Sequence, residues 1–290
     1  MKNSRTLRCV FAVLGAILTV SALTAQAGEV MADSFMSQAL GRSYKMRVYL
    51  PDGYTNSAGS YPVVYLLHGA GDDESGWTTN GGAKEAFDDL IKRGLMRPSI
   101  AVMPGNGVSW YVDGAAEKAE TALMTELMPY VEKKYRIARE RGMRAIGGHS
   151  MGGYGALHLA LKFPDKFCAA ALISPAIYDP VPPEASSARR APQFMRKGQF
   201  DIELWKSHNY PTYLDTYNRA ARKVPMWIVS GDHDFLGVAL VSAQLYWRLF
   251  QTQPKQVELR IIDGDHEWRV WRDALPDALR YMDGQCTRSG

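Results

Sequence analysis

Cysteine is scarce in this sequence, at 3 of 290 residues, which excludes a fold that depends on disulfides. Lysine and arginine form no long block, and we expect the doublet Arg189-Arg190 to lie in a solvated loop, so no nucleic-acid partner is expected. No apolar run reaches the roughly 20 residues of a membrane helix. There is no internal repeat, and no histidine pair has the H-x-x-x-H spacing of a metal site. These absences leave a globular protein for which we expect no cofactor and no metal.

The N-terminus has the pattern of a secretory signal peptide. Three basic residues within the first eight precede an apolar run at 9–23, which ends before the small-residue triplet Ala25-Gln26-Ala27. We expect residues 1–27 to be removed and the mature chain to be secreted or periplasmic, without stable insertion in the membrane. Cleavage would take away three of the 34 basic residues and leave 31 against 30 acidic ones, so the basic character comes largely from the leader.

The remaining residues, 28–290, are enough for one large core, and we expect one domain. Cys168 and Cys286 stay in this part of the chain. An oxidising compartment would allow them to pair, but their spacing does not decide whether they do.

Short apolar runs alternate with amphipathic stretches along most of the chain. This order predicts an α/β fold with a mostly parallel central sheet and helices on both faces. The predicted strands are 45–50, 63–67, 99–103, 144–147, 169–173, 226–229 and 257–262. The predicted helices are 83–93, 119–134, 154–162, 238–252 and 270–281.

One connection, residues 179–223, is too long for an ordinary loop and is rich in proline and aromatic residues. It is either a cap that shapes an acyl or aromatic pocket, or a helical insertion whose aromatic residues pack on the body. The sequence favours neither.

The strongest chemical signal is the turn from Gly148 to Gly153, which contains Ser150 in the pattern G-x-S-x-G. It follows a predicted strand and opens a predicted helix. A serine hydroxyl is a weak nucleophile and must be raised toward a base, and flanking glycines permit the cramped turn that does so. Ser150 is therefore the predicted nucleophile.

A base and an acid should follow the serine in chain order, acid first. His266 comes after the last predicted strand, in a turn at the edge of the sheet where active sites of open α/β sheets lie. We expect it to be the base, and His158, His208 and His233 to be structural or exposed.

The acid should come from the segment 230–235, which closes the preceding strand and offers two carboxylates. We favour Asp234, which would hold the imidazole tautomer, and the alternative is Asp232, a residue also suited to capping a turn.

Two backbone amides should stabilise the oxyanion. One belongs to Met151, the residue after the nucleophile. The other should come from the loop 68–73, whose small residues allow close approach of a carbonyl. Ala70 is the favoured donor and Gly71 the second choice, while His68 is expected to shape the loop.

A hydrolytic metal site can also be drawn from the histidines and aspartates near the strand ends. It would leave the turn at Ser150 unexplained, so we disfavour it. The residues concerned are His68, Asp72, Asp73, Asp232, His233, Asp234, Asp263, Asp265 and His266.

Taken together, these motifs resemble the branch of the α/β-hydrolases that includes esterase D, bacterial feruloyl and acetyl-xylan esterases, and the mycolyltransferase antigens. The resemblance spans nearly the whole chain after residue 27. The residues that carry it are Val64 to Gly69, Ser109-Trp110-Tyr111, Glu120-Thr121, Glu126-Leu127, Gly148 to Gly153, Gly231 with Asp234, and His266-Glu267-Trp268 with Trp271.

The resemblance implies the same triad, Ser150, Asp234 and His266, with the amides of Ala70 and Met151 as oxyanion hole. We therefore expect an exported serine esterase whose substrate is a small-molecule or polysaccharide-linked ester. Acyl transfer to a sugar or lipid hydroxyl is the alternative, and a binding protein without catalysis is a third, disfavoured reading.

Overall fold

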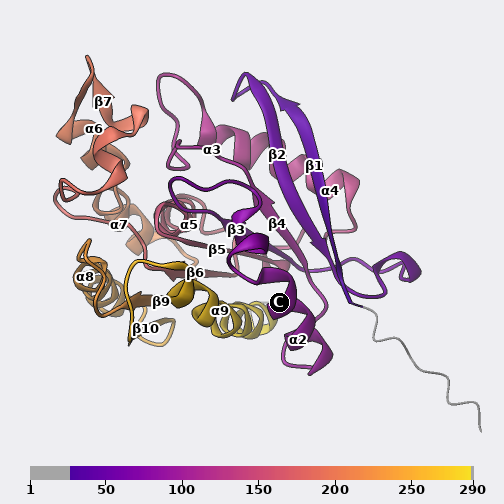
Figure 1. The fold of residues 1–290 in the computed structure, drawn as a ribbon. Coiled ribbons are helices and arrows are strands. Elements are labelled where there is room, and N and C mark those ends of the chain that lie inside the picture. The colour runs from indigo at the N-terminus through magenta and orange to yellow at the C-terminus, as the bar shows by residue number, and fades with distance from the viewer. Residues whose placement is uncertain (1–26, 289–290) are drawn as a thin grey trace, which may run out of the picture.

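A sheet of eight strands forms the centre of the molecule in the computed structural model, which describes residues 27–288 (Figure 1). The spatial order of the strands is β1-β2-β4-β3-β5-β6-β9-β10. β1 and β2 pair antiparallel with each other, β2 pairs antiparallel with β4, and the other pairs are parallel. The sheet strands are β1 (Glu29–Ser37), β2 (Arg42–Leu50), β3 (Val63–Leu67), β4 (Ile100–Pro104), β5 (Arg144–His149), β6 (Ala169–Ile173), β9 (Met226–Gly231) and β10 (Val257–Ile262).

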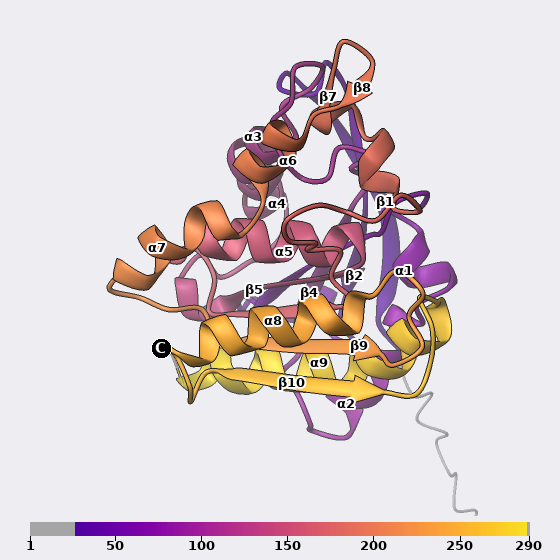
Figure 2. The same cartoon turned by 90° about the vertical axis from the view of Figure 1, so that its left-hand side faces the viewer.

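Helices cover both faces of this sheet. Because side chains alternate along a strand, Val63, Tyr65 and Leu67 of β3 join one buried cluster, whereas Val64 and Leu66 join another. The first cluster holds α4, α5 and α8, and the second holds α2 and α9; Figure 2 shows α8 and α9 on opposite sides of β9 and β10. The helices are α1 (Gly76–Thr79), α2 (Ala83–Lys92), α3 (Ala119–Thr121), the π-helical turn Ala122–Leu127, α4 (Met128–Lys134), α5 (Met151–Lys162), α6 (Ile202–His208), α7 (Pro211–Arg219), α8 (Val238–Phe250) and α9 (Trp268–Arg288).

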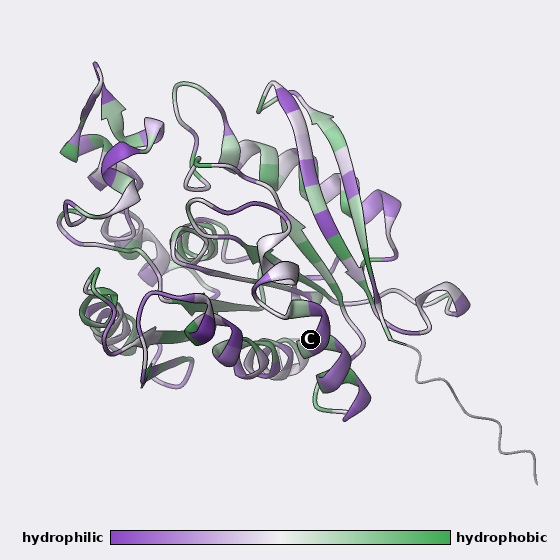
Figure 3. Ribbon diagram, viewed as in Figure 1, coloured by the Kyte–Doolittle hydropathy of each residue, from purple (hydrophilic) through white to green (hydrophobic). Residues whose placement is uncertain are grey.

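The predicted α/β class and mostly parallel sheet are confirmed, and three predicted strands, β3, β6 and β10, have the bounds expected. The strand β1 was not predicted. It lies at the edge of the sheet and pairs with β2 alone among the strands, so its residues are mostly exposed or half-buried and carry no sustained apolar run. Apolar and polar residues alternate along the β1–β2 hairpin, whereas the central strands are largely hydrophobic (Figure 3).

Residues 179–223 form a chain of short elements beside α5 and α8. After the 3₁₀ turns Ser187–Arg190 and Pro192–Phe194 come the two-residue strands β7 (Met195–Arg196) and β8 (Gln199–Phe200), then α6 and α7 (Figure 1). Phe194 and Trp205 are fully buried and pack edge-to-face on Trp110 of the body. Aromatic packing of this kind anchors the segment.

Cys168 and Cys286 form a disulfide, with 5.0 Å between their Cα atoms. It joins the residue before β6 to the last turn of α9 across 118 residues of sequence. The pairing that the sequence left open is therefore present in the structure.

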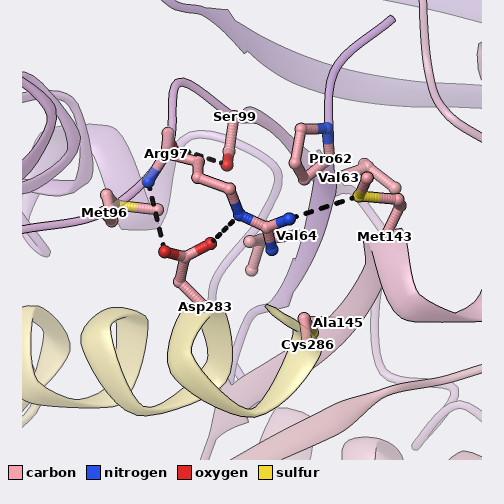
Figure 4. Close-up of a pocket in the computed structure, with 10 residues that line it drawn as sticks. All are labelled: Pro62, Val63, Val64, Met96, Arg97, Ser99, Met143, Ala145, Asp283 and Cys286. Atoms are coloured by element: carbon pink, nitrogen blue, oxygen red, sulfur yellow. Dashed lines mark hydrogen bonds and ion pairs between the residues drawn. The ribbon is translucent and has the colours of Figure 1, made fainter. Parts of the chain in front are cut away.

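A small cavity of about 10 Å³ lies next to this cross-link. Figure 4 shows the Arg97 guanidinium pointing toward Asp283 of α9, where Nε donates to the carboxylate at 2.7 Å. The backbone N–H of Arg97 donates to the same carboxylate at 3.2 Å. A space of this size holds at most one water molecule, so these contacts attach α9 to the body and form no binding site.

The predicted signal peptide falls on residues of which the structure describes only Ala27. Within residues 27–288, no helix combines the length and apolar character that a membrane span requires.

Candidate active site

Ser150 occupies a sharp turn between β5 and α5. Its backbone has φ 54° and ψ −118°, a conformation that costs a non-glycine residue on the order of 1–3 kcal/mol. The glycines around it are sterically required, since a Cβ on Gly152 would come within 2.2 Å of the carbonyl oxygen of Leu67, and one on Gly148 within 2.5 Å of that of Gly152. The turn therefore presents the serine hydroxyl at the end of the strand, as predicted for a nucleophile.

The structure brings the three predicted triad side chains together. His266 Nε2 lies 2.8 Å from Ser150 Oγ, and His266 Nδ1 lies 2.7 Å from Asp234 Oδ2. The Asp234 side chain is fully buried and that of His266 is 11% exposed. Because Nδ1 donates to the carboxylate, Nε2 is left to accept the serine proton.

Asp234 is also held by the backbone, as Oδ1 accepts the Leu236 N–H at 3.0 Å. Asp232 instead accepts the Gly264 N–H at 3.1 Å and is 45% exposed, so it caps a turn. Asp265 Oδ1 accepts the N–H groups of His266 and Phe235, which lowers the Asp265 pKa and ties the loop of His266 to the loop of Asp234.

The remaining histidines after Ser150 have other partners. His158 is buried, with Nε2 2.5 Å from Glu120 Oε2. His208 packs against Phe194, and the exposed His233 pairs with Asp232 at 2.7 Å. His266 is thus the histidine that contacts the serine.

The two predicted oxyanion donors flank Ser150. Met151 is the first residue of α5, and the first N–H groups of a helix have no partner within it. Ala70 and Gly71 line the same cavity as Ser150, and Gly71 has φ +84°. A carbonyl oxygen placed in this cavity can therefore approach the early loop and the helix start together.

Two histidines hold Gly69, the residue before Ala70. Its N–H donates to His149 Nε2 at 3.1 Å, and its carbonyl oxygen lies 2.8 Å from His68 Nδ1. His68 Nε2 in turn accepts the Asn106 N–H at 2.9 Å. Both rings are buried, so the backbone of Gly69 is held at its N–H and at its carbonyl oxygen.

These contacts require neutral imidazoles that carry the proton on Nδ1. Burial lowers the pKa of His68, and burial together with His68 and His266 lowers the pKa of His149 well below 6.5. Asp72 Oδ2 lies 3.9 Å from His149 Nε2, but that nitrogen already accepts the Gly69 N–H, so the two side chains form no ion pair. No sequence pattern pointed to His149. It directly precedes Ser150 in the chain, and that position alone does not indicate a contact with Gly69.

A cavity of about 420 Å³ opens onto Ser150 and His266. Most of its wall is apolar, and part of it comes from residues 185–191, inside the long connection. The other lining residues are Ala70, Gly71, Val108, Trp110, Phe235 and Leu236.

Three of the residues in the disfavoured metal site do lie close together in the structure. Ligand atoms of Asp232, His233 and Asp263 lie within 4.8 Å of one another, and all three residues are exposed. None of them lines the cavity at Ser150. His266 and Asp234, which the metal reading also used, are engaged with each other.

A family model described as "Putative esterase" matches residues 37–282. The chain belongs to this family. Among curated relatives of the esterase, an endo-1,4-beta-xylanase/feruloyl esterase of Xylanibacter ruminicola is 33% identical over 53% of this chain, and an esterase of Mycobacterium tuberculosis is 37% identical over 47%. The matches span only 22% and 30% of those two proteins.

A diacylglycerol acyltransferase/mycolyltransferase of Mycobacterium leprae is 29% identical over 78% of this chain and 70% of its own length. A solved ferulic acid esterase superposes with a TM-score of 0.77 at 28% identity, covering 90% of this chain and 99% of that structure. The family and the α/β-hydrolase fold expected from the motifs are therefore both shown.

Proposed function

We propose that this chain is a serine carboxylic-ester hydrolase that works through an acyl-enzyme on Ser150. The observation that carries the proposal is the unbroken succession of contacts from Asp234 through His266 to Ser150, at 2.7 and 2.8 Å, which ends in an open cavity. Membership in an esterase family supports it. Residues 28–290 would act as one domain, with part of 179–223 forming a wall of the cavity.

In the first half of the reaction, His266 Nε2 takes the Ser150 proton as Oγ attacks the ester carbonyl carbon. The Ala70 and Met151 amides donate to the oxyanion, and each such donor is worth roughly a hundred- to a thousand-fold in rate. Asp234 stabilises the imidazolium. His266 then gives the proton to the departing alcohol, and the acyl group stays on Ser150.

In the second half, water takes the place of the alcohol. His266 removes a proton from the water as its oxygen attacks the acyl carbon, and returns that proton to Ser150 Oγ as the ester bond to the enzyme breaks. The carboxylic acid leaves and the resting enzyme is restored.

The test compares two serine variants on short p-nitrophenyl esters and with a fluorophosphonate probe. Ser150→Ala should lose at least about a thousandfold in kcat and all labelling. Ser60→Ala, at an exposed position, is the matched control and should keep both. Ordinary turnover or labelling by Ser150→Ala would refute the proposal.

Acyl transfer to a sugar or lipid hydroxyl is the second candidate, favoured by the similarity to the mycobacterial acyltransferase. Its first half is identical, so the competition between water and an acceptor alcohol decides. Adding sugar and glycerolipid acceptors should give transesterified product if this candidate is right. Acid as the sole product with every acceptor would exclude it.

The substrate is proposed to be a small-molecule or polysaccharide-linked ester. The similarity to a ferulic acid esterase structure supports an aromatic acyl group, and Trp110 and Phe235 in the cavity wall would suit one. Rates on acetyl, butyryl, octanoyl and feruloyl esters would rank the acyl groups.

Export is also part of the proposal. The disulfide supports it, since such bonds persist in oxidising compartments, and so does the leader pattern at residues 1–27. N-terminal sequencing of protein from the cell exterior or periplasm should find Gly28 first. Full-length chain confined to the cytoplasm, with Cys168 and Cys286 reduced, would argue against export.

A further inference from the structure

Arg190 gives the Ser150 cavity a charge that nothing in its wall balances. It is the one arginine or lysine among the cavity-lining residues, and no aspartate or glutamate of the described chain is among them. The neighbouring wall is apolar or small, with Val108, Phe235 and Leu236 facing the same space.

The neighbouring Arg189, in contrast, contacts other residues of the same segment through its side chain. Its Nε donates to the Pro182 carbonyl at 2.8 Å, and its Nη2 lies 3.0 Å from Glu184. Its guanidinium also covers the Phe200 ring at 4.7 Å. Glu184, the nearby acid, is therefore paired with Arg189.

The side chain of Arg190 makes no hydrogen bond, ion pair or ring contact with any residue of the described part of the chain, and it is exposed. It does not hold the fold together. What distinguishes it from a solvated surface arginine is its place in the wall of the cavity that contains the nucleophile and the base.

We propose that Arg190 makes this enzyme selective for esters that carry an anionic group, a carboxylate or phosphate, beyond the reacting carbonyl. The inference rests on the proposed function and names the substrate class of the same site. The fork of N–H donors on a guanidinium matches such groups in a bidentate geometry. Apolar walls strengthen the attraction relative to open water, and the absence of a carboxylate in the wall leaves the charge for the substrate.

Two arms of the experiment distinguish an anion on the acyl side of the ester from one on the alcohol side. In the first arm, methyl hydrogen adipate is compared with a neutral analogue in which an isopropyl group replaces the carboxylate. In the second arm, the same exchange is made on the alcohol side, with the acetate ester of an omega-hydroxyhexanoate. The ratio of kcat/KM for the anionic and neutral members is the readout.

Three proteins are compared: wild type, Arg190→Gln and Lys197→Gln. Lys197 is exposed in the same segment and lines no part of the cavity, so its variant makes the same change of net charge elsewhere. Wild type should favour the anionic ester about three- to tenfold in at least one arm, the range between an exposed and a partly desolvated ion pair. Arg190→Gln should bring that ratio to about 1 by lowering kcat/KM for the anionic ester, and Lys197→Gln should keep the ratio.

Added salt should reduce the wild-type preference, because an exposed charge is screened. A wild-type ratio of one or less in both arms, or a preference that survives Arg190→Gln, overturns the inference while ester hydrolysis stands. Failure to hydrolyse the neutral esters as well would overturn the proposed function itself.

Discussion

The imidazole of His149 stacks on the indole of Trp271, with 4.1 Å between the ring centroids and 27° between the planes. His149 ends β5, next to the nucleophile, and Trp271 lies in the first turn of α9. The indole of Trp77 packs on the same imidazole in a T-shaped arrangement, with 5.1 Å between the ring centroids. The ring that accepts the Gly69 N–H is thus oriented by a helix from the far end of the chain.

Replacing His149 by phenylalanine should keep the stacking and remove the acceptor for Gly69. The unpaired buried N–H should cost about 1–3 kcal/mol of unfolding free energy. If the loop carrying Ala70 also shifts, kcat should fall about 10- to 100-fold with KM nearly unchanged. Denaturant unfolding and steady-state kinetics measure the two effects.

The control for this variant is His158→Phe, which removes another buried histidine that contacts Glu120 rather than the loop. It should lose stability but little kcat. An unaltered kcat in His149→Phe would mean that the ring only packs.

The depressed pKa of His149 predicts a pH dependence of stability. Unfolding exposes an imidazole whose pKa returns to about 6.5, so the unfolded chain binds the proton first. Stability from this group is therefore complete above pH 6.5 and is lost as the pH falls below it. The melting temperature should drop between pH 7.5 and 5. It should drop less steeply in His149→Phe, where the buried His68 still contributes. Equal slopes in the two proteins would count against a lowered pKa of His149.

Asp234→Asn should lower kcat by about 10⁴-fold, because the amide cannot hold the Nδ1–H tautomer or stabilise the imidazolium. Asp232→Asn, two residues away and exposed, should stay within about threefold of wild type. The kcat for one ester and the rate of inactivation by a phosphonate are measured for both variants. Equal losses in the two variants would remove the distinction between triad acid and turn residue.

Gly152→Ala tests the steric demand of the nucleophile turn. The added methyl group would meet the backbone of Leu67 at 2.2 Å, so the turn or β3 has to move, at about 3 kcal/mol or more. Gly284→Ala is the matched control, since a Cβ there meets nothing within 4 Å and alanine favours a helix by up to about 1 kcal/mol. Urea unfolding should show the two changes with opposite signs.

The disulfide should add about 2–5 kcal/mol to the unfolding free energy, in line with the long loop it closes. The double variant Cys168→Ala, Cys286→Ala should unfold at lower denaturant and keep its activity while folded. Wild type with added thiol should match it, and the variant should not respond to thiol. A thiol-insensitive wild type with free cysteines would contradict the cross-link.

The parts of the site that were predictable obey local rules. The turn at Ser150 needs glycines within a few residues, and parallel strands deliver their carboxyl ends to one edge. The loops after β9 and β10 could therefore be expected to bring Asp234 and His266 to Ser150, as they do in the structure. Asp234 and Asp232 were harder to separate, because their difference is burial, which depends on the rest of the fold.

The parts that were missed depend on distant contacts. His149 acquires its environment from Trp271, more than a hundred residues later, and nothing in its neighbours announces this. The doublet Arg189-Arg190 was expected in a solvated loop, yet the structure separates its members, placing Glu184 against one and the cavity beside the other. The edge strand β1 pairs with one strand and is little buried, so its pattern of apolar residues was too weak to predict a strand.

The sulfur bridge from Cys168 to Cys286 encloses both Asp234 and His266, together with the wall segment that holds Arg190. A protease that cut the backbone once inside this stretch would leave two fragments still joined to each other. Such a nicked molecule would run as one band on a gel until a reductant was added, and Asp234 and His266 would remain covalently linked to Ser150.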